Sequence, residues 1–275
     1  MLWLRAVEML RSQRQPGVLV TVTAVRGHSP RHAGAKMVVG EHDTWDSVGG
    51  GNLEMVAIQR ARALLAQDAP APVTISSQLS DKAPYEHGVQ CCGGVVTMLL
   101  EPLHVTPVVA IFGMGHVGHE LARILARHDL DLHLVDTRPE QLAEAMMGPY
   151  ADADARIHSH QMPVLPELVL GGLPAGTHIL VMTHDHAEDY AIVDAALRTE
   201  GLGSIGLIGS SAKWSRFRSR LLREGGFDLE ALERVRTPIG LPTVTSKEPA
   251  AIAVGVAADL LGTFAHQRLS AAHSG

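Results

Sequence analysis

The stretch that decides the fold is residues 108–136, VVAIFGMGHVGHELARILARHDLDLHLVD. Its first five residues, Val108 to Phe112, form an apolar run that suits a buried strand of a parallel sheet. A G-x-G-x-x-G turn, an amphipathic helix and a second strand ending at Asp136 come next. A loop and a helix near residues 138–147 are expected to follow. Strand, glycine turn, helix, strand and acid form the order of a dinucleotide-binding unit, so the sequence predicts a Rossmann-like domain.

Each glycine of this turn has an expected role. Gly113 permits the tight turn, Gly115 lets backbone N–H groups approach a phosphate, and Gly118 lets helix and strand pack closely. The N-terminus of the helix adds partial positive charge. Asp136 is expected to accept hydrogen bonds from a ribose diol, which favours NAD over a nucleotide with a 2′-phosphate. The alternative is a Rossmann-shaped scaffold whose cleft holds another ligand or none.

Length, charge and cysteine content limit the class of protein. The chain has 275 residues, enough for one or two domains, and its net charge of -6 gives no reason to expect a nucleic-acid partner. No apolar run approaches a membrane span, and the N-terminus lacks a signal-peptide pattern. Two adjacent cysteines make no disulfide framework, so a cytoplasmic location is the expectation.

The first hundred residues predict a smaller domain of mixed helices and strands. The expected elements are helices at 2–15 and 53–65, and strands at 18–25, 35–39, 44–48, 73–75 and 95–100. Prolines at 102 and 107 mark a junction after them. We therefore predict an α/β protein with an N-terminal mixed α+β domain, residues 1–104, followed by a Rossmann-like parallel-sheet domain, residues 105–275.

Three consecutive glycines, Gly49, Gly50 and Gly51, precede a helix of the N-terminal domain. Glycines at the start of a helix expose several backbone N–H groups, so this stretch predicts an anion-binding site. The alternative is a flexible turn in which Asn52 caps the helix.

The run Cys91-Cys92-Gly93-Gly94 lies between a polar loop and a strand. Glycine lets a bulky ligand approach the backbone, and an accessible thiol can bind a soft metal or carry sulfur. Cys92 is therefore the candidate metal ligand, and Gly93 stands beside it in the candidate cofactor site. The alternative is a pair of small buried residues at the start of a strand.

Two further strands of the C-terminal domain end in polar residues. The strand at 178–182 is followed by His184, and the strand at 205–208 is followed by Ser210 and Lys213. In an open α/β sheet, ligands bind at the carboxyl ends of the strands. We therefore expect these three side chains to converge with the glycine turn on one anionic ligand. The alternative for Lys213 is a place on a solvated helix face.

Seven motifs follow one another along nearly the whole chain. They are Thr21-Val22-Thr23, Gly49-Gly50-Gly51-x-Leu53-Glu54, Cys92-Gly93-Gly94, Gly113-x-Gly115-His116-Val117-Gly118, Val181-Met182-Thr183-His184, Ile205-Gly206-Leu207-Ile208-Gly209-Ser210, and Pro238-Ile239-Gly240-Leu241-Pro242 with Lys247-Glu248-Pro249-Ala250. In this order they resemble the XdhC/CoxI family, accessory proteins of xanthine dehydrogenase and related molybdenum hydroxylases. The chain departs from that pattern at Asn52, where many relatives carry Cys and others His, and at Cys91, since most relatives have only the second cysteine.

The resemblance implies a chaperone that binds molybdenum cofactor, a molybdopterin. It also implies help with the cofactor's sulfuration by a cysteine desulfurase, and insertion into apo-xanthine dehydrogenase or a related molybdenum hydroxylase. The candidate groups are divided between two domains, which suits enclosing a large ligand better than a compact catalytic site.

The alternative is an NAD(P)-dependent oxidoreductase that uses the Rossmann cleft, with His184 as proton donor. A third is a scaffold that holds NAD or another nucleotide as a structural ligand. The sequence leaves open whether two chains form a homodimer.

Overall fold

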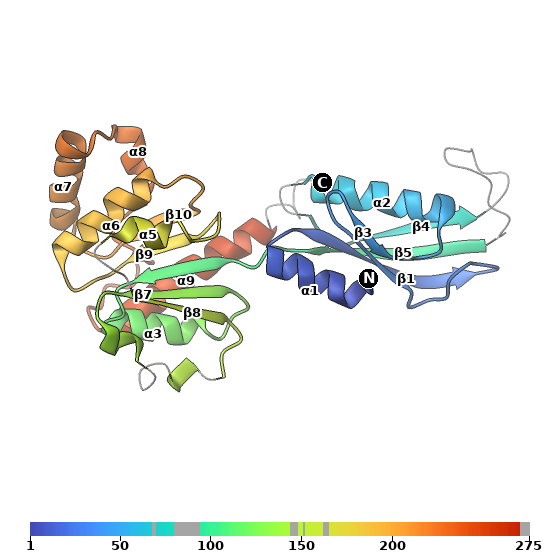
Figure 1. Ribbon diagram of the computed structural model, residues 1–275, viewed down its shortest axis with the longest axis horizontal. Helices are drawn as coiled ribbons and strands as arrows, with labels where there is room; N and C mark the ends of the chain where they lie inside the picture. The colour runs from blue at the N-terminus through green and yellow to red at the C-terminus, as the bar shows by residue number, and fades with distance from the viewer. Residues whose placement is uncertain (68–69, 80–93, 144–147, 151, 162–164, 270–275) are drawn as a thin grey trace. The chain divides into compact units, whose positions relative to one another are not determined.

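The structure is a computed structural model that describes residues 1–67, 70–79, 94–143, 148–150, 152–161 and 165–269. The chain forms two compact units (Figure 1). The N-terminal unit consists mainly of Met1–Val105, and the C-terminal unit is Thr106–Phe264. One sheet is antiparallel and the other is parallel, which confirms the predicted fold class of a mixed α+β part followed by a Rossmann-like part.

The N-terminal unit is a five-stranded antiparallel sheet in the order β3-β2-β1-β5-β4, with a helix on each face. Its elements are α1 (Trp3–Gln13), β1 (Gly17–Arg26), β2 (Lys36–Val39), β3 (Thr44–Asp46), α2 (Gly51–Leu65), β4 (Val73–Leu79) and β5 (Gly94–Leu103). Successive side chains of a strand point to opposite faces. Val18, Val20 and Val22 of β1 accordingly pack with α2, whereas Leu19 packs with α1.

The C-terminal unit is a six-stranded parallel sheet in the order β11-β10-β9-β6-β7-β8. Its strands are β6 (Val108–Phe112), β7 (Asp131–Asp136), β8 (Arg156–Gln161), β9 (His178–Val181), β10 (Ser204–Leu207) and β11 (Val235–Arg236). Its helices are α3 (His116–Leu125), α5 (Pro166–Leu170), α6 (His186–Arg198), α7 (Ser211–Arg220), α8 (Leu229–Glu233) and α9 (Pro249–Leu269), with short helical turns η1 (Pro139–Leu142), η2 (Gly148–Tyr150) and η3 (Leu221–Gly225).

Both faces of this parallel sheet are covered, which explains the continuous apolar run of β6. Val109 and Ile111 pack on one face with α3 and α9, and Ala110 and Phe112 pack on the other face with α6 and its neighbours. The chain leaves β6 for β7 on one side and returns for β9 on the other, so the strand order reverses between β6 and β9. A crevice at the carboxyl ends of these two strands is where an open α/β sheet binds ligands.

Two local predictions need correction. The helix expected at 53–65 begins two residues earlier, at Gly51, so the glycine run enters the helix itself. The helix expected near 138–147 is described only as the single 3-10 turn η1, Pro139–Leu142, and residues 144–147 lie outside the described part. Among the described helices, none has the length and apolar character needed to cross a membrane.

Candidate functional site

The G-x-G-x-x-G turn joins β6 to α3 and packs against the end of β9. Gly113 has a φ of +107°, and a Cβ there would overlap the carbonyl of Met182. A Cβ on Gly118 would overlap the carbonyl oxygen of Gly113. A Cβ on Gly115, by contrast, meets no described atom within 4 Å. Two of the three glycines are thus required by the fold, and Gly115 borders open space where a ligand can approach the backbone.

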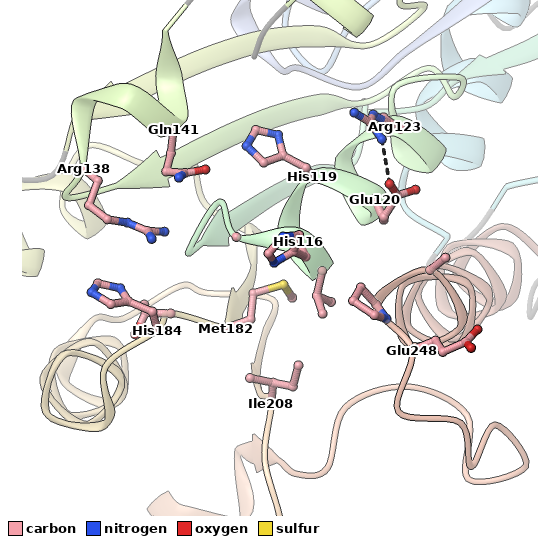
Figure 2. Close-up of a pocket in the computed structure, with 15 residues that line it drawn as sticks. His116, His119, Glu120, Arg123, Arg138, Gln141, Met182, His184, Ile208 and Glu248 are labelled. Carbon is pink, nitrogen blue, oxygen red and sulfur yellow. Dashed lines mark hydrogen bonds and ion pairs between the residues drawn. The ribbon is translucent and has the colours of Figure 1, made fainter.

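A cavity of about 1070 Å³ opens beside this turn (Figure 2). It is lined by Gly115, His116, Val117, His119, Glu120, Arg123, Arg138, Gln141, Met182, Thr183, His184, Ile208, Glu248, Pro249 and Ala250. Small-molecule pockets measure about 300–1,000 Å³, so this one has room for a ligand as large as a nucleotide. The N-cap residue of α3 is Gly115, which has no side chain to cap the helix, so in the described part of the chain the backbone N–H groups of the first turn remain as donors for such a ligand.

His119 is a buried histidine in the lining of this cavity. Its Nδ1 lies 2.9 Å from the Tyr150 hydroxyl, and its Nε2 has no hydrogen-bond partner in the described chain. Burial lowers the pKa of His119 and outweighs the opposing effect of the nearby Gln141 amide. The ring is therefore neutral near pH 7.

Asp136 stands at the end of β7, where a ribose-binding acid is expected. It is only 3% exposed, and four N–H donors reach its carboxylate. Met114 N donates to Oδ2 at 2.7 Å, and Arg138 donates from its backbone, its Nε and its Nη2, each at 2.9 Å. Burial alone would raise the pKa of Asp136, but the hydrogen bonds from Arg138 and Met114 hold the pKa below its ordinary value. In the structure this acid joins the glycine turn to the loop after β7.

His184 lies at the other side of the cavity, after β9. Its side chain is half exposed, and Nδ1 is 3.8 Å from Oε2 of Glu188 in the first turn of α6. Burial raises the pKa of Glu188, and the charge of Asp136 adds to this effect. The predicted convergence of His184 with the glycine turn is therefore present in the cavity lining, although its role there stays a prediction.

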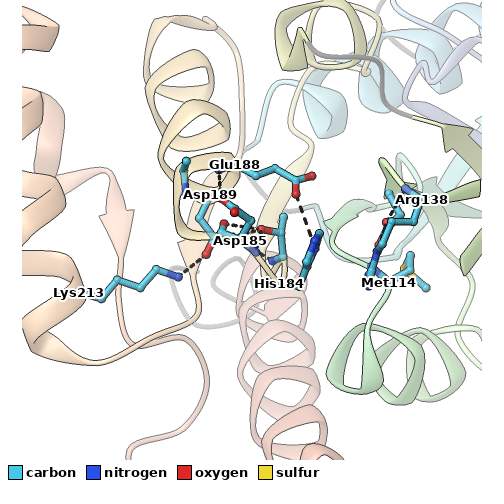
Figure 3. Close-up of polar contacts among 10 residues, drawn as sticks. Met114, Arg138, His184, Asp185, Glu188, Asp189 and Lys213 are labelled. Atoms are coloured by element: carbon cyan, nitrogen blue, oxygen red, sulfur yellow. Dashed lines mark hydrogen bonds and ion pairs between the residues drawn. The ribbon is translucent and has the colours of Figure 1, made fainter.

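Lys213 belongs to a buried network instead of the cavity lining (Figure 3). Its Nζ pairs with Oδ2 of Asp189 and also donates to the carbonyl of Ile208 at 2.9 Å. The other oxygen of Asp189 accepts from the backbone and the hydroxyl of Thr183, at 3.0 and 2.8 Å. The lysine therefore links α7 to α6 and to the ends of β9 and β10. It is buried, so the alternative of a place on a solvated helix face is wrong.

Ser210 caps α7 by accepting a hydrogen bond from the Lys213 backbone N–H at 3.3 Å. It lines a separate cavity of about 450 Å³ together with residues of the 238–247 loop. Ile208 borders both cavities. The predicted convergence of Ser210 and Lys213 with His184 is therefore not seen within the larger cavity.

In the N-terminal unit, the glycine run already has internal acceptors. Gly50 N donates to Glu54 at 3.0 Å, and Gly49 N donates to the hydroxyl of Ser47 at 3.1 Å. Ser47 in turn donates to the same Glu54 oxygen at 2.7 Å. The Glu54 carboxylate thus occupies the position that an external anion would take at Gly50. Anion binding by Gly49, Gly50 and Gly51 stays a prediction.

The predicted metal ligand, Cys92, and its neighbour Gly93 lie outside the described residues. Across the described ranges, no group of three or more His, Cys, Asp or Glu side chains is placed to hold a metal ion. Gly94, where the description resumes, lies against the backbone of Arg26 and His28, which leaves no room for a Cβ.

Of the residues that line the cavity, the sequence prediction named only Gly115 and His184 as site residues, and the polar side chains that it missed include His119, Arg138 and Gln141. Arg138 follows the acidic residue of the Rossmann pattern by two positions, which is a signal that sequence inspection can use. His119 and Gln141 carry no such signal, because only the fold brings them into the same cavity lining.

Two family models match this chain. The XdhC Rossmann domain matches residues 109–260, and the XdhC and CoxI family matches residues 10–76. The first covers the glycine turn, the cavity lining and most of α9.

Relatives are found in Escherichia coli (strain K12). The molybdenum cofactor insertion chaperone PaoD is 23% identical over 95% of this chain and 87% of its own length. The uncharacterized protein YqeB is 23% identical over 92% of this chain, which spans 44% of the length of that relative. A crystal structure described as a xanthine dehydrogenase from Bacillus halodurans is 20% identical, covers 96% of both chains and has a TM-score of 0.48. Since the Rossmann-domain model alone matches more than half of the residues, the chain belongs to the XdhC family.

Proposed function

We propose that this protein binds molybdenum cofactor and inserts it into xanthine dehydrogenase or a related molybdenum hydroxylase. The observation that carries the proposal is the match to PaoD, a molybdenum cofactor insertion chaperone, over nearly the full length of both chains. The partner would be the apo-enzyme, in the cytoplasm. A cysteine desulfurase would supply the sulfur that such a cofactor needs.

The residues present fit the phosphate end of a molybdopterin. Phosphate binds well at a helix N-terminus whose N–H groups are unused, and α3 begins beside the open face of Gly115. The cavity is large enough for the pterin that follows the phosphate. Bound there, the cofactor would supply the metal and its sulfur ligands, while the chain holds the phosphate and encloses the pterin. Cys92 remains our candidate thiol for the metal end.

Transfer of the cofactor tests this function. The cofactor-loaded protein should raise the activity of an apo-molybdenum hydroxylase above that reached with free cofactor, in an assay that contains a desulfurase and a sulfur source. The Cys92→Ser variant should retain less cofactor and activate less, with the melting temperature nearly unchanged. Cys91→Ser is the matched control and should behave like the natural protein.

Two results would contradict the proposal. One is equal activation of the apo-enzyme without this protein. The other is oxidation of NADH with a simple carbonyl acceptor by this protein alone, which would favour the NAD(P)-dependent oxidoreductase.

A further inference from the structure

Asp136 is the acid that the Rossmann pattern assigns to a ribose, but its hydrogen-bond acceptor sites are already occupied. A carboxylate offers about four acceptor sites, and four N–H groups already reach Asp136 within 2.9 Å. The side chain is 3% exposed, so a ligand hydroxyl could bind it only by displacing one of these donors. The expected preference for an unmodified ribose therefore loses its physical basis.

Arg138, and not its partner Asp136, is the member of this pair that lines the cavity (Figures 2 and 3). Its side chain is 28% exposed, in contrast with its buried partner Asp136, and it lines the cavity. Nε and Nη2 bind Asp136, whereas Nη1 makes no hydrogen bond to the described chain. A guanidinium carries only donors, and it binds a phosphate in a fixed fork geometry. The pair with Asp136 holds that fork in place.

We propose that Arg138, and not Asp136, recognises the ligand at this end of the cavity, and that it binds a phosphate monoester. The proposal rests on the proposed function insofar as the same cavity is the cofactor site. Two ligands carry the required group. One is a nucleotide with a 2′-phosphate, and the other is molybdopterin, whose single terminal phosphate Arg138 would share with the N–H groups at the start of α3, since both border the same cavity. The carboxylates whose charges act on Arg138 are Asp136, Glu140 and Glu188, so a phosphate must bind the arginine in their presence.

The first part of the test compares nucleotides and uses only the natural protein. Calorimetry with adenosine 2′,5′-bisphosphate and AMP, and with NADP and NAD, should show the 2′-phosphorylated member of each pair bound roughly tenfold to a hundredfold more tightly. This order is opposite to the one expected from Asp136 as a ribose acceptor. Equal or weaker binding of both 2′-phosphorylated probes would exclude a 2′-phosphate nucleotide as the ligand.

The variant arm uses Arg138→Ala with Arg127→Ala as a matched control. Arg127 is exposed just after α3 and is not among the residues of the cavity lining, so its removal changes only the general charge. Arg138→Ala should lose the preference for the 2′-phosphate and bind AMP and NAD more tightly, because Asp136 regains free oxygens. If this variant does not fold, Arg138→Lys keeps the charge but loses the fork, and it should lose most of the preference.

The molybdopterin arm identifies the source of the phosphate and separates the two proposals. A roughly tenfold or greater loss of molybdopterin affinity in Arg138→Ala, without a loss in Arg127→Ala, supports the inference even if no nucleotide binds. Molybdopterin binding that Arg138→Ala leaves unchanged, with no preference for a 2′-phosphate, overturns the inference but leaves the proposed function intact. Nucleotide binding that depends on Arg138, with no molybdopterin binding, supports the inference about Arg138 and overturns the proposed function. No binding of any probe overturns both.

Discussion

Replacing Lys213 by methionine is expected to lower the free energy of unfolding by about 3–5 kcal/mol, because it leaves a buried carboxylate without its counter-charge. Lys213 is 6% exposed and Asp189 is fully buried. Methionine has a similar volume, so packing is largely kept and the loss reports the charge. The affected contacts hold the ends of β9 and β10 to α6 and α7, and they border the candidate site.

Two controls make this result interpretable by urea unfolding. The double variant Lys213→Met with Asp189→Asn should be more stable than Lys213→Met alone, since no unpaired charge is buried and the asparagine oxygen still accepts from Thr183. Glu224→Gln breaks an exposed pair with Arg220 and should leave the unfolding free energy close to that of the natural protein. A loss below about 1 kcal/mol for Lys213→Met would contradict the buried network.

Gly118 and Gly115 should separate stability from ligand binding. Gly118→Val is expected to destabilise the fold by about 2–4 kcal/mol, because its side chain would meet the carbonyl of Gly113. Gly115→Ala has room for its methyl group and an ordinary negative φ of -79°. It should cost only about 0.5–1 kcal/mol, for a poorer helix cap. Its methyl group, however, fills the space from which a phosphate approaches the backbone.

Calorimetry with AMP, NAD and molybdopterin measures the effect of Gly115→Ala on ligand binding. The Gly115→Ala variant should bind the ligand of the natural protein roughly tenfold less tightly or worse, which corresponds to about 1.4 kcal/mol or more. The melting temperature of the same sample shows that it is folded. Unchanged affinity for all three ligands in a folded Gly115→Ala variant would exclude the turn from ligand binding.

The sequence predicted the C-terminal sheet because its signals are local and agree with one another. Val108 to Phe112 is apolar on every residue, and the structure shows why: helices cover both faces of β6. The glycine spacing also predicted the turn, since Gly113 and Gly118 each lie where a Cβ would strike backbone. In both cases one short stretch of sequence is enough to predict the local structure.

Other features depend on individual side-chain contacts, which the sequence patterns do not report. Glu54 accepts from Gly50 inside the glycine run, and Asp189 pairs with Lys213 across 24 positions of sequence. A charged side chain on a helix is usually solvated, so nothing in the sequence near Lys213 indicates its burial. Arg138 lies only two positions after Asp136, and it was missed because the Rossmann pattern names the acid and not the residue that neutralises it.

The most direct measurement is the molybdopterin content of the protein purified from a host able to make molybdenum cofactor. Mass analysis of the released ligand should find one molybdopterin per chain or a substantial fraction of that amount, and little of it in Gly115→Ala purified alongside. A chain that carries only a nicotinamide nucleotide, or that carries no molybdopterin while the same host fills its molybdenum enzymes, would contradict the proposed role as a molybdenum cofactor chaperone.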